Sequence, residues 1–162
     1  MWRSVQIFCV FYCCIVKDYV ASECPNGWTY YESSCYFFGH SDVDFLDAER
    51  FCSHYGAHLV SIETANEGTF VKSYLADLKD PYHWIGLTDE IIEGEWKWQA
   101  NDSTSNYTDW YPGQPDGHKG ANCAGIFANH RYQWLDVACT SKYRPLCEIP
   151  SNGETIMSAD EL

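Results

Sequence analysis

Basic residues and long apolar runs are scarce in this sequence of 162 residues. Only 10 Lys and Arg residues stand against 23 Asp and Glu residues, so the formal net charge is -13. This acidic balance argues against nucleic acid as a partner and disfavours an anionic membrane surface. The apolar run over residues 5–16 is shorter than the roughly 20 residues that a membrane-spanning helix needs. We therefore predict no membrane span.

The motifs of common enzyme classes are also missing. The sequence has no glycine-rich phosphate loop, no serine nucleophile elbow and no His-Glu-x-x-His motif. Its histidines outside the long loop show no zinc-type spacing. Internal repeats and coiled-coil heptads are absent as well, so residues 23–150 are predicted to form one compact domain that is not an enzyme.

The amino terminus has the pattern of a secretory signal peptide. Arg3 precedes the apolar run, and Val20-Ala21-Ser22 supplies small or compact residues for cleavage before Glu23. We predict a signal peptide over residues 1–22 and a secreted, extracellular protein. A retained membrane anchor is the alternative.

The carboxyl terminus differs in composition from the domain. Residues 151–162 are polar and acidic, without an aromatic residue, and are predicted to form a flexible tail. The final Ala159-Asp160-Glu161-Leu162 differs from the Lys-Asp-Glu-Leu retention signal in its first residue. Retention in the endoplasmic reticulum is therefore an alternative to export, which we favour.

Cysteine is abundant, with 9 residues in the whole sequence. Cys9, Cys13 and Cys14 fall within the predicted signal peptide. An even number remains in the exported domain, which indicates three disulfides. The remaining cysteines are Cys24, Cys35, Cys52, Cys123, Cys139 and Cys147. They allow 15 pairings, and sequence alone selects none of them.

Apolar periodicity predicts two helices and several strands. The first helix is predicted over residues 44–55, with Tyr55 on its buried face. The second begins at Thr64, with a capping box to Glu67, and is predicted to bury Leu78 near its end. Strands are predicted over residues 28–38, 58–62, 83–87, 122–127, 132–137 and 145–149. The stretch 93–122 lacks periodicity but contains tryptophans. Such a long ordered loop is usually functional.

Six motifs follow one another in a recognisable order. They are Cys24-Pro25-Asn26-Gly27-Trp28, Trp84-Ile85-Gly86-Leu87, Gly94-Glu95-Trp96-Lys97-Trp98, Trp110-Tyr111-Pro112-Gly113-Gln114-Pro115-Asp116, Trp134-Leu135-Asp136-Val137-Ala138-Cys139 and Pro145-Leu146-Cys147-Glu148. In order and spacing the chain resembles a C-type lectin domain of the long form, and small secreted invertebrate lectins of the perlucin-like type look most similar. The resemblance implies an α+β fold with two helices, small antiparallel sheets and a long ligand-binding loop.

The resemblance also implies a disulfide pairing and a metal site. It pairs Cys24 with Cys35, Cys52 with Cys147, and Cys123 with Cys139. It makes Gln114, Asp116 and Asp136 ligands of Ca²⁺ and of a carbohydrate, since calcium prefers carboxylate and amide oxygens. In this family the order Gln-Pro-Asp accompanies galactose-type hydroxyl arrangements. His118 is a candidate for contact with the apolar face of the sugar, against the alternative of an exposed loop histidine.

Two departures from the family pattern weaken the calcium site. The pattern has an asparagine where this chain has Leu135, and a glutamate where it has Ala121. Calcium binding is therefore predicted at the weak end, at about 10⁻⁴ to 10⁻³ M or weaker. A turn kept only for loop structure is the alternative. Family positions also suggest a second calcium site at Asp89, Glu93 and Asn122.

The predicted function is calcium-assisted binding of galactose-type glycans or glycoproteins by a secreted lectin, in innate immune recognition. The alternative is a metal-independent domain for protein or mineral interaction on the same fold. Sequons at Asn101 and Asn106 predict a glycoprotein. The tryptophans of the motifs, namely Trp96, Trp98, Trp110 and Trp134, are predicted to be core residues rather than sugar platforms.

Overall fold

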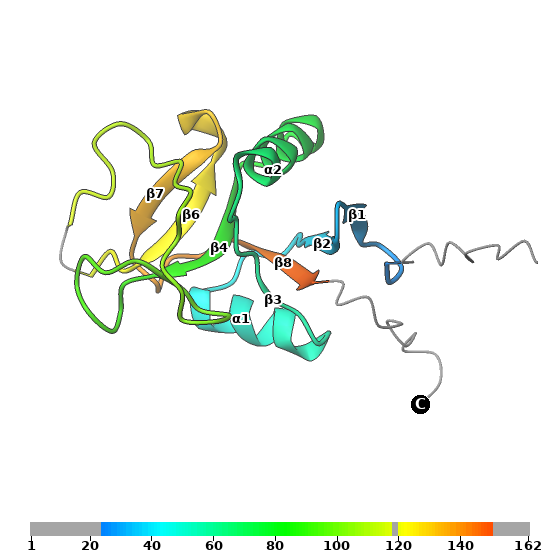
Figure 1. The fold of residues 1–162 in the computed structure, drawn as a ribbon, viewed down its shortest axis with the longest axis horizontal. Coiled ribbons are helices and arrows are strands. Elements are labelled where there is room, and N and C mark those ends of the chain that lie inside the picture. Colours follow the sequence, from blue (N-terminus) through cyan, green and yellow to red (C-terminus); the bar gives the residue numbers. More distant parts are fainter. Residues whose placement is uncertain (1–23, 118–119, 151–162) are drawn as a thin grey trace, which may run out of the picture.

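The computed structural model describes residues 24–117 and 120–150 (Figure 1). The predicted signal peptide, the predicted tail and His118 lie outside the described residues. Eight strands, two α-helices and a 3-10 turn make up the domain. In chain order they are β1 (Thr29–Tyr31), β2 (Ser34–Phe38), α1 (Phe45–His54), β3 (His58–Leu59), α2 (Ala65–Leu78), β4 (Tyr82–Thr88), β5 (Lys97–Trp98), β6 (Cys123–Phe127), η1 (Ala128–His130), β7 (Gln133–Val137) and β8 (Arg144–Pro150).

The strands form two antiparallel groups that one parallel pairing joins. Strands β1, β2, β8 and β3 pair on one side, and strands β5, β4, β6 and β7 pair on the other. Between them, β4 runs parallel to β8 with His83 opposite Arg144. Helices α1 and α2 lie on opposite sides of these strands, and the long loop between β5 and β6 lies at the end of the molecule away from β1 (Figure 1). The predicted fold class is confirmed.

Side-chain caps set the start of both helices. The Asp44 carboxylate accepts a hydrogen bond from Asp47 N at 2.9 Å, and the Thr64 hydroxyl accepts one from Glu67 N at 3.2 Å. The Glu67 carboxylate accepts from Glu63 N at 2.9 Å, so the predicted capping box forms with the reciprocal bond shifted by one residue. The two helices thus begin where local sequence chemistry predicts.

The core consists of two clusters of buried side chains. One packs α2 against the strands and includes Val71, Leu75, Trp98 and Trp134. The other lies under α1, where Phe45 contacts Trp84 edge-on and the Cys52–Cys147 disulfide crosses from helix to strand. The implied pairing is confirmed, because Cys24–Cys35 and Cys123–Cys139 are the other two disulfides.

Several local predictions were wrong. Tyr55 and Leu78 are 51% and 44% exposed, because they sit where each helix ends and periodicity no longer determines which side faces the core. The strand predicted over residues 58–62 stops at Leu59, although Val60 still donates to Leu146 O at 2.8 Å. The strand predicted over residues 28–38 is a hairpin that turns after Tyr31, where Glu32 has a positive φ of 50°.

Within the described part of the chain, no helix has both the length and the apolarity of a membrane span.

Candidate functional site

The segment that carries Gln114 and Asp116 runs beside strand β7. Trp134 N donates to Asp109 O, and Tyr111 N donates to Trp134 O, each at 2.9 Å. Gln114 N then closes a turn onto Tyr111 O at 2.8 Å. Because these are backbone bonds, they fix the register of the segment against β7. Asp136 lies further along the same strand.

The structure brings together the three main predicted ligands. Gln114 Nε2 donates to Asp116 Oδ2 at 3.1 Å, and Asp116 N donates to both carboxylate oxygens of Asp136 at 3.2 Å. The Gln114–Pro115 peptide bond is cis. Asp136 is buried at 8% exposure, whereas Asp116 is exposed. The cluster therefore has a buried floor and an exposed rim.

The oxygens of this cluster fit a hard cation. Gln114 Oε1 is buried without a hydrogen-bond partner, and such an orphaned acceptor costs free energy. Desolvation, and after it the charge of Asp116, raises the pKa of the Asp136 carboxyl above its ordinary value. A cation bound by these oxygens would offset both costs. Gln114, Asp116 and Asp136 are therefore suited to hold Ca²⁺.

A second group of oxygens lies where β4 runs into the loop. Asp89 N donates to Asn122 O at 3.2 Å, and Thr88 Oγ1 donates to the same oxygen at 2.7 Å. Asp89 Oδ2 accepts from Gly94 N at 2.8 Å, while Asp89 Oδ1 and Asn122 Oδ1 are buried without a partner. Glu93 is exposed. The structure thus brings Asp89 next to Asn122, and the predicted second site retains two orphaned acceptors.

The two residues that depart from the family pattern lie beside these oxygens. Leu135 neighbours Asp136 on β7 and pairs with Gly125, and it is half-buried. Ala121 precedes Asn122 and is also half-buried. Neither side chain carries an oxygen, so the ligand set is smaller than the family pattern implies.

The tryptophans of the loop are packing residues. Trp134 contacts Trp98, Trp110 and Tyr107 edge-on, with ring centroids 5.7 to 5.8 Å apart. Trp98 and Trp134 are buried, and the half-buried Trp96 and Trp110 pack on each other at 4.8 Å. These aromatic contacts pack the long loop against β5 and β7.

One hollow of the described surface lies away from the cluster. It has a volume of about 290 Å³ and is lined by residues that include Ile91, Lys97 and Trp98, but not by Gln114, Asp116 or Asp136. The candidate site is a different place on the surface, where Asp116 is exposed and Gln114 is half-buried.

Both sequons are exposed at the rim of the loop. The Asn101 side chain accepts from Ser103 N at 3.0 Å and from Ser103 Oγ at 2.7 Å. Asn101 and Asn106 border one hollow with Glu63 and Thr64. Accessibility therefore favours both as acceptors.

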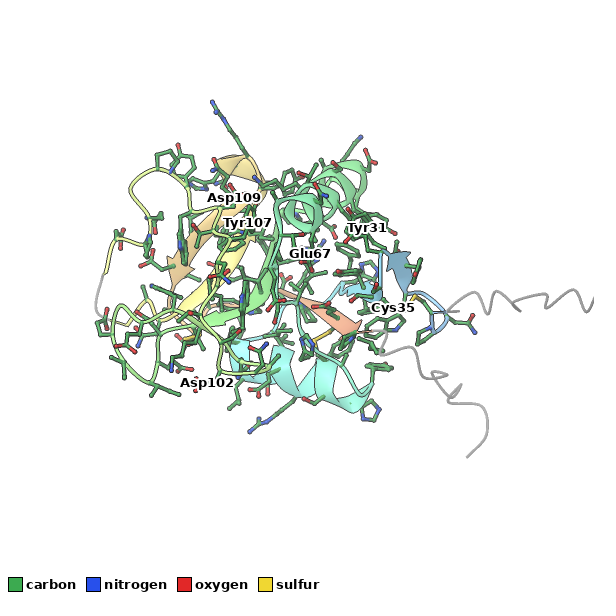
Figure 2. The ribbon with its side chains drawn as sticks, viewed as in Figure 1. Tyr31, Cys35, Glu67, Asp102, Tyr107 and Asp109 are labelled. Carbon is green, nitrogen blue, oxygen red and sulfur yellow. A yellow bond between two sulfur atoms is a disulfide. The ribbon has the colours of Figure 1, made fainter. Side chains whose placement is uncertain are left out.

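Sequence reasoning missed two contacts that support this region. Lys72 of α2 forms an ion pair with Asp109 of the long loop, and Gln133 Nε2 donates to the other oxygen of Asp109 at 3.1 Å. Figure 2 shows Asp109 and Tyr107 beside the helix that carries Glu67. No local pattern could have indicated the ion pair, because the two residues are far apart in the chain.

Comparison with known proteins shows the family of this chain. The family model of the lectin C-type domain matches residues 41–149. C-type lectin domain family 10 member A of Homo sapiens is 39% identical over 132 residues, which are 77% of this chain and 40% of that protein. A perlucin-like protein of Mytilus galloprovincialis is 32% identical over 121 residues, which are 74% of this chain and 78% of that protein. The chain belongs to the C-type lectin family, and the predicted likeness to perlucin-like proteins is confirmed.

Two solved structures show the range of the fold. The carbohydrate-recognition domain of the human scavenger receptor C-type lectin is 36% identical, with a TM-score of 0.73 over 79% of this chain and 99% of that one. A calcium-independent type II antifreeze protein is 26% identical, with a TM-score of 0.72 over 79% of this chain and 95% of that one. The same fold therefore occurs in a carbohydrate-recognition domain and in a calcium-independent antifreeze protein.

Proposed function

We propose that this domain binds galactose-type glycans through Gln114 and Asp116, with a weakly held calcium ion. The observation that carries the proposal is the 3.1 Å contact between Gln114 Nε2 and Asp116 Oδ2. It places a donor and a charged acceptor side by side at the exposed rim of the site. Two neighbouring hydroxyls of a sugar can bind such a pair, because one can accept from the amide while the other donates to the carboxylate.

Each residue has a distinct role in this proposal. The Gln114 amide nitrogen donates to a sugar hydroxyl, and the Asp116 carboxylate accepts from the next one. Asp136 holds Asp116 in place through the bonds from Asp116 N. A bound Ca²⁺ ion would supply an electrophilic centre for the same hydroxyl oxygens. His118 is proposed to contact the sugar's apolar face, and Asp89, Glu93 and Asn122 to form a second calcium site.

Binding of a single sugar is expected to be weak. The cluster is open, and Leu135 and Ala121 contribute no ligand oxygen, so few atoms hold either ligand. Useful avidity would require several copies of the site presented together.

Competition between galactose and mannose tests the proposal. The protein should elute from a galactose matrix with galactose or chelator, and mannose should elute it less well. Exchange of the two side-chain chemistries, with Gln114→Glu and Asp116→Asn, should reverse that preference. Retention that ignores chelator and both substitutions would contradict the proposal.

The proposed setting is extracellular, as a glycosylated lectin of innate immune recognition. Asn101 and Asn106 are exposed, and each lies in a sequon. Intact mass should fall on amidase treatment of protein made in a eukaryotic secretory pathway. Secretion into the medium, with and without residues 159–162, distinguishes export from retention. Equal secretion of both forms is the expected result.

A metal-independent interaction domain is the second candidate. Leu135 favours it, because an aliphatic side chain replaces a ligand amide, and a calcium-independent antifreeze protein has a similar structure. Under this alternative, calorimetry would detect no heat of calcium binding, and chelator would not change ligand binding. Those two results together would replace the first proposal.

A further inference from the structure

The long loop is attached to helix α2 as well as to β7. Apart from short bridges at Thr104 and Trp110, the described part between β5 and β6 has no regular pairing, so its shape depends on individual contacts. Backbone bonds hold Asp109 and Tyr111 to Trp134 on the β7 side. On the α2 side, the Asp109 side chain pairs with that of Lys72, and the Tyr107 side chain lies against the backbone of Gly68.

Asp109 is the charged member of this attachment. Its side chain is 15% exposed, and that of Lys72 is 30% exposed. One carboxylate oxygen accepts from Gln133 Nε2 at 3.1 Å, and the other forms the ion pair with Lys72 Nζ. A partly buried pair of this kind is screened less than a surface pair, and loss of one partner leaves the other charge poorly solvated.

Tyr107 is the packing member. Its ring contacts Trp134 edge-on at 5.8 Å, and its hydroxyl lies over Gly68 of α2. A Cβ atom at position 68 would lie 2.6 Å from that hydroxyl oxygen, closer than contact distance allows. Glycine at this position is therefore what lets the loop approach the helix, and Figure 2 shows Tyr107 on that side of the loop.

The attachment leads directly to the candidate site. Tyr111 lies in the same segment as Asp109, and its backbone oxygen accepts from Gln114 N at 2.8 Å. Asp116 N then donates to the Asp136 carboxylate. A displacement of Asp109 from α2 would thus be passed to Gln114 and Asp116 through backbone bonds. A site whose groups are already in place binds more tightly, because less conformational entropy is lost on binding.

We propose that Lys72 is a positioning residue for the candidate site, because its ammonium group holds the long loop against α2 and so supports the register that the backbone bonds to β7 set for Gln114 and Asp116. This role rests on the proposed function of that site. Lys72 does not contact the ligand in this scheme. It acts through Asp109, and Gly68 acts in the same direction through Tyr107.

The test uses Lys72→Met, which keeps the apolar stem and removes the charge. Calcium affinity by calorimetry should fall about 10-fold, the lower end of what loss of a supporting contact costs a metal site. Amide hydrogen exchange at Tyr111 and Gln114 should be faster in Lys72→Met than in the native protein. Both are measured in chelator, so that no bound metal contributes. Lys72→Arg should restore both values, and Lys79→Met, at an exposed position on the cap of α2, should change neither.

A second variant disturbs the attachment of the loop to α2 at Tyr107, without altering charge. Gly68→Ala should displace Tyr107, accelerate the same amide exchange and weaken calcium binding, even if Lys72→Met were to fold poorly. Unchanged affinity and unchanged exchange in Lys72→Met would overturn the positioning role alone. Absence of calcium binding in the native protein would overturn the proposed function, and the exchange rates would then decide by themselves whether Lys72 holds the loop.

Discussion

The two halves of the domain are stabilised in different ways. The half with α1, β1, β2 and β8 has regular elements and two disulfides, one of which joins residues separated by 95 positions. The half with β4, β5, β6 and β7 contains the long loop, which has little regular structure, and one disulfide with a separation of 16. Trp98 and Trp134 join the core there, and oxygens of Asp89, Gln114 and Asn122 are buried without a partner. Covalent and ladder constraints thus fix the scaffold, while the site keeps acceptors for a ligand.

Removal of disulfides should separate the two halves most strongly. Cys52→Ala with Cys147→Ala should lower the free energy of unfolding by about 4 to 5 kcal/mol, because a long closed loop is released. Cys123→Ala with Cys139→Ala should cost about 3 kcal/mol, since the loop is much shorter. Urea unfolding of both variants measures the difference. Equal losses would show that the length of the closed loop does not determine how much each disulfide stabilises the domain.

Truncation of a buried ring tests whether the loop half has a true core. Trp134→Ala should destabilise the domain by about 3 to 5 kcal/mol, because Trp134 is 1% exposed and three aromatic rings lose their contact. Trp96→Ala, at a half-buried position, should cost less. Thermal unfolding followed by tryptophan fluorescence is the measurement. A smaller loss of stability from Trp134→Ala than from Trp96→Ala would refute the role of Trp134 as a core residue.

Helix α2 brings a buried carboxylate, that of Glu67, against β2 of the scaffold half, and its ionisation opposes folding. Desolvation raises the pKa of Glu67 from its ordinary 4.5 to about 7, and Glu148 adds like charge, although Tyr36 Oη donates to Glu67 at 2.9 Å. The folded state therefore keeps a proton that the unfolded chain has released between about pH 4.5 and 7. Stability from this group is complete below that window and is lost as the pH rises through it.

Glu67→Gln should remove that pH dependence. The free energy of unfolding of the native protein should fall between pH 5 and 8, measured in chelator. In the variant this fall should be smaller by about 2 kcal/mol. The difference between the two curves separates Glu67 from other titrating groups, such as His83, whose pKa burial lowers to about 3. Asp77→Asn, exposed on the same helix, is the control and should leave the curve unchanged. Parallel curves for Glu67→Gln would disprove the assignment.

The smallest expected effect is that of calcium on the loop half. At 10 mM calcium and a dissociation constant of about 1 mM, binding stabilises the native state by about 1.4 kcal/mol. The melting temperature should rise by about 4 °C. Asp136→Asn should abolish the rise, while Asp77→Asn should preserve it. A native protein that melts at the same temperature with and without calcium would favour the metal-independent alternative.

Local structure was predicted well where one segment contains its own signal. Asp44 and Thr64 cap the helices at the expected places, because an N-cap acts on amides of the next turn. The errors at Tyr55 and Leu78 fall at helix ends, where periodicity loses its meaning. Strand β5 was missed, because Lys97–Trp98 is too short to show a pattern and exists through pairing with β4.

For the candidate site, the sequence identified the residue types and the family resemblance supplied their roles. Gln114 and Asp116 are neighbours in the chain, so their contact in the structure follows from a short motif. Asp136 and Asn122 come from other segments, and their distances to Asp116 and Asp89 depend on how β6, β7 and the loop pack. The signal peptide, the tail and His118 fall outside the described residues and stay predictions.

The sequence by itself determined the helix starts, the sequons and the Gln114-Pro115-Asp116 motif, since each depends on residues close together in the chain. Only the tertiary structure decided that β4 runs parallel to β8, that Glu67 lies near Glu148 and that Lys72 meets Asp109. Such contacts join segments far apart in the chain. Their energy exists only after loop closure and burial of the whole core, and no local pattern records it.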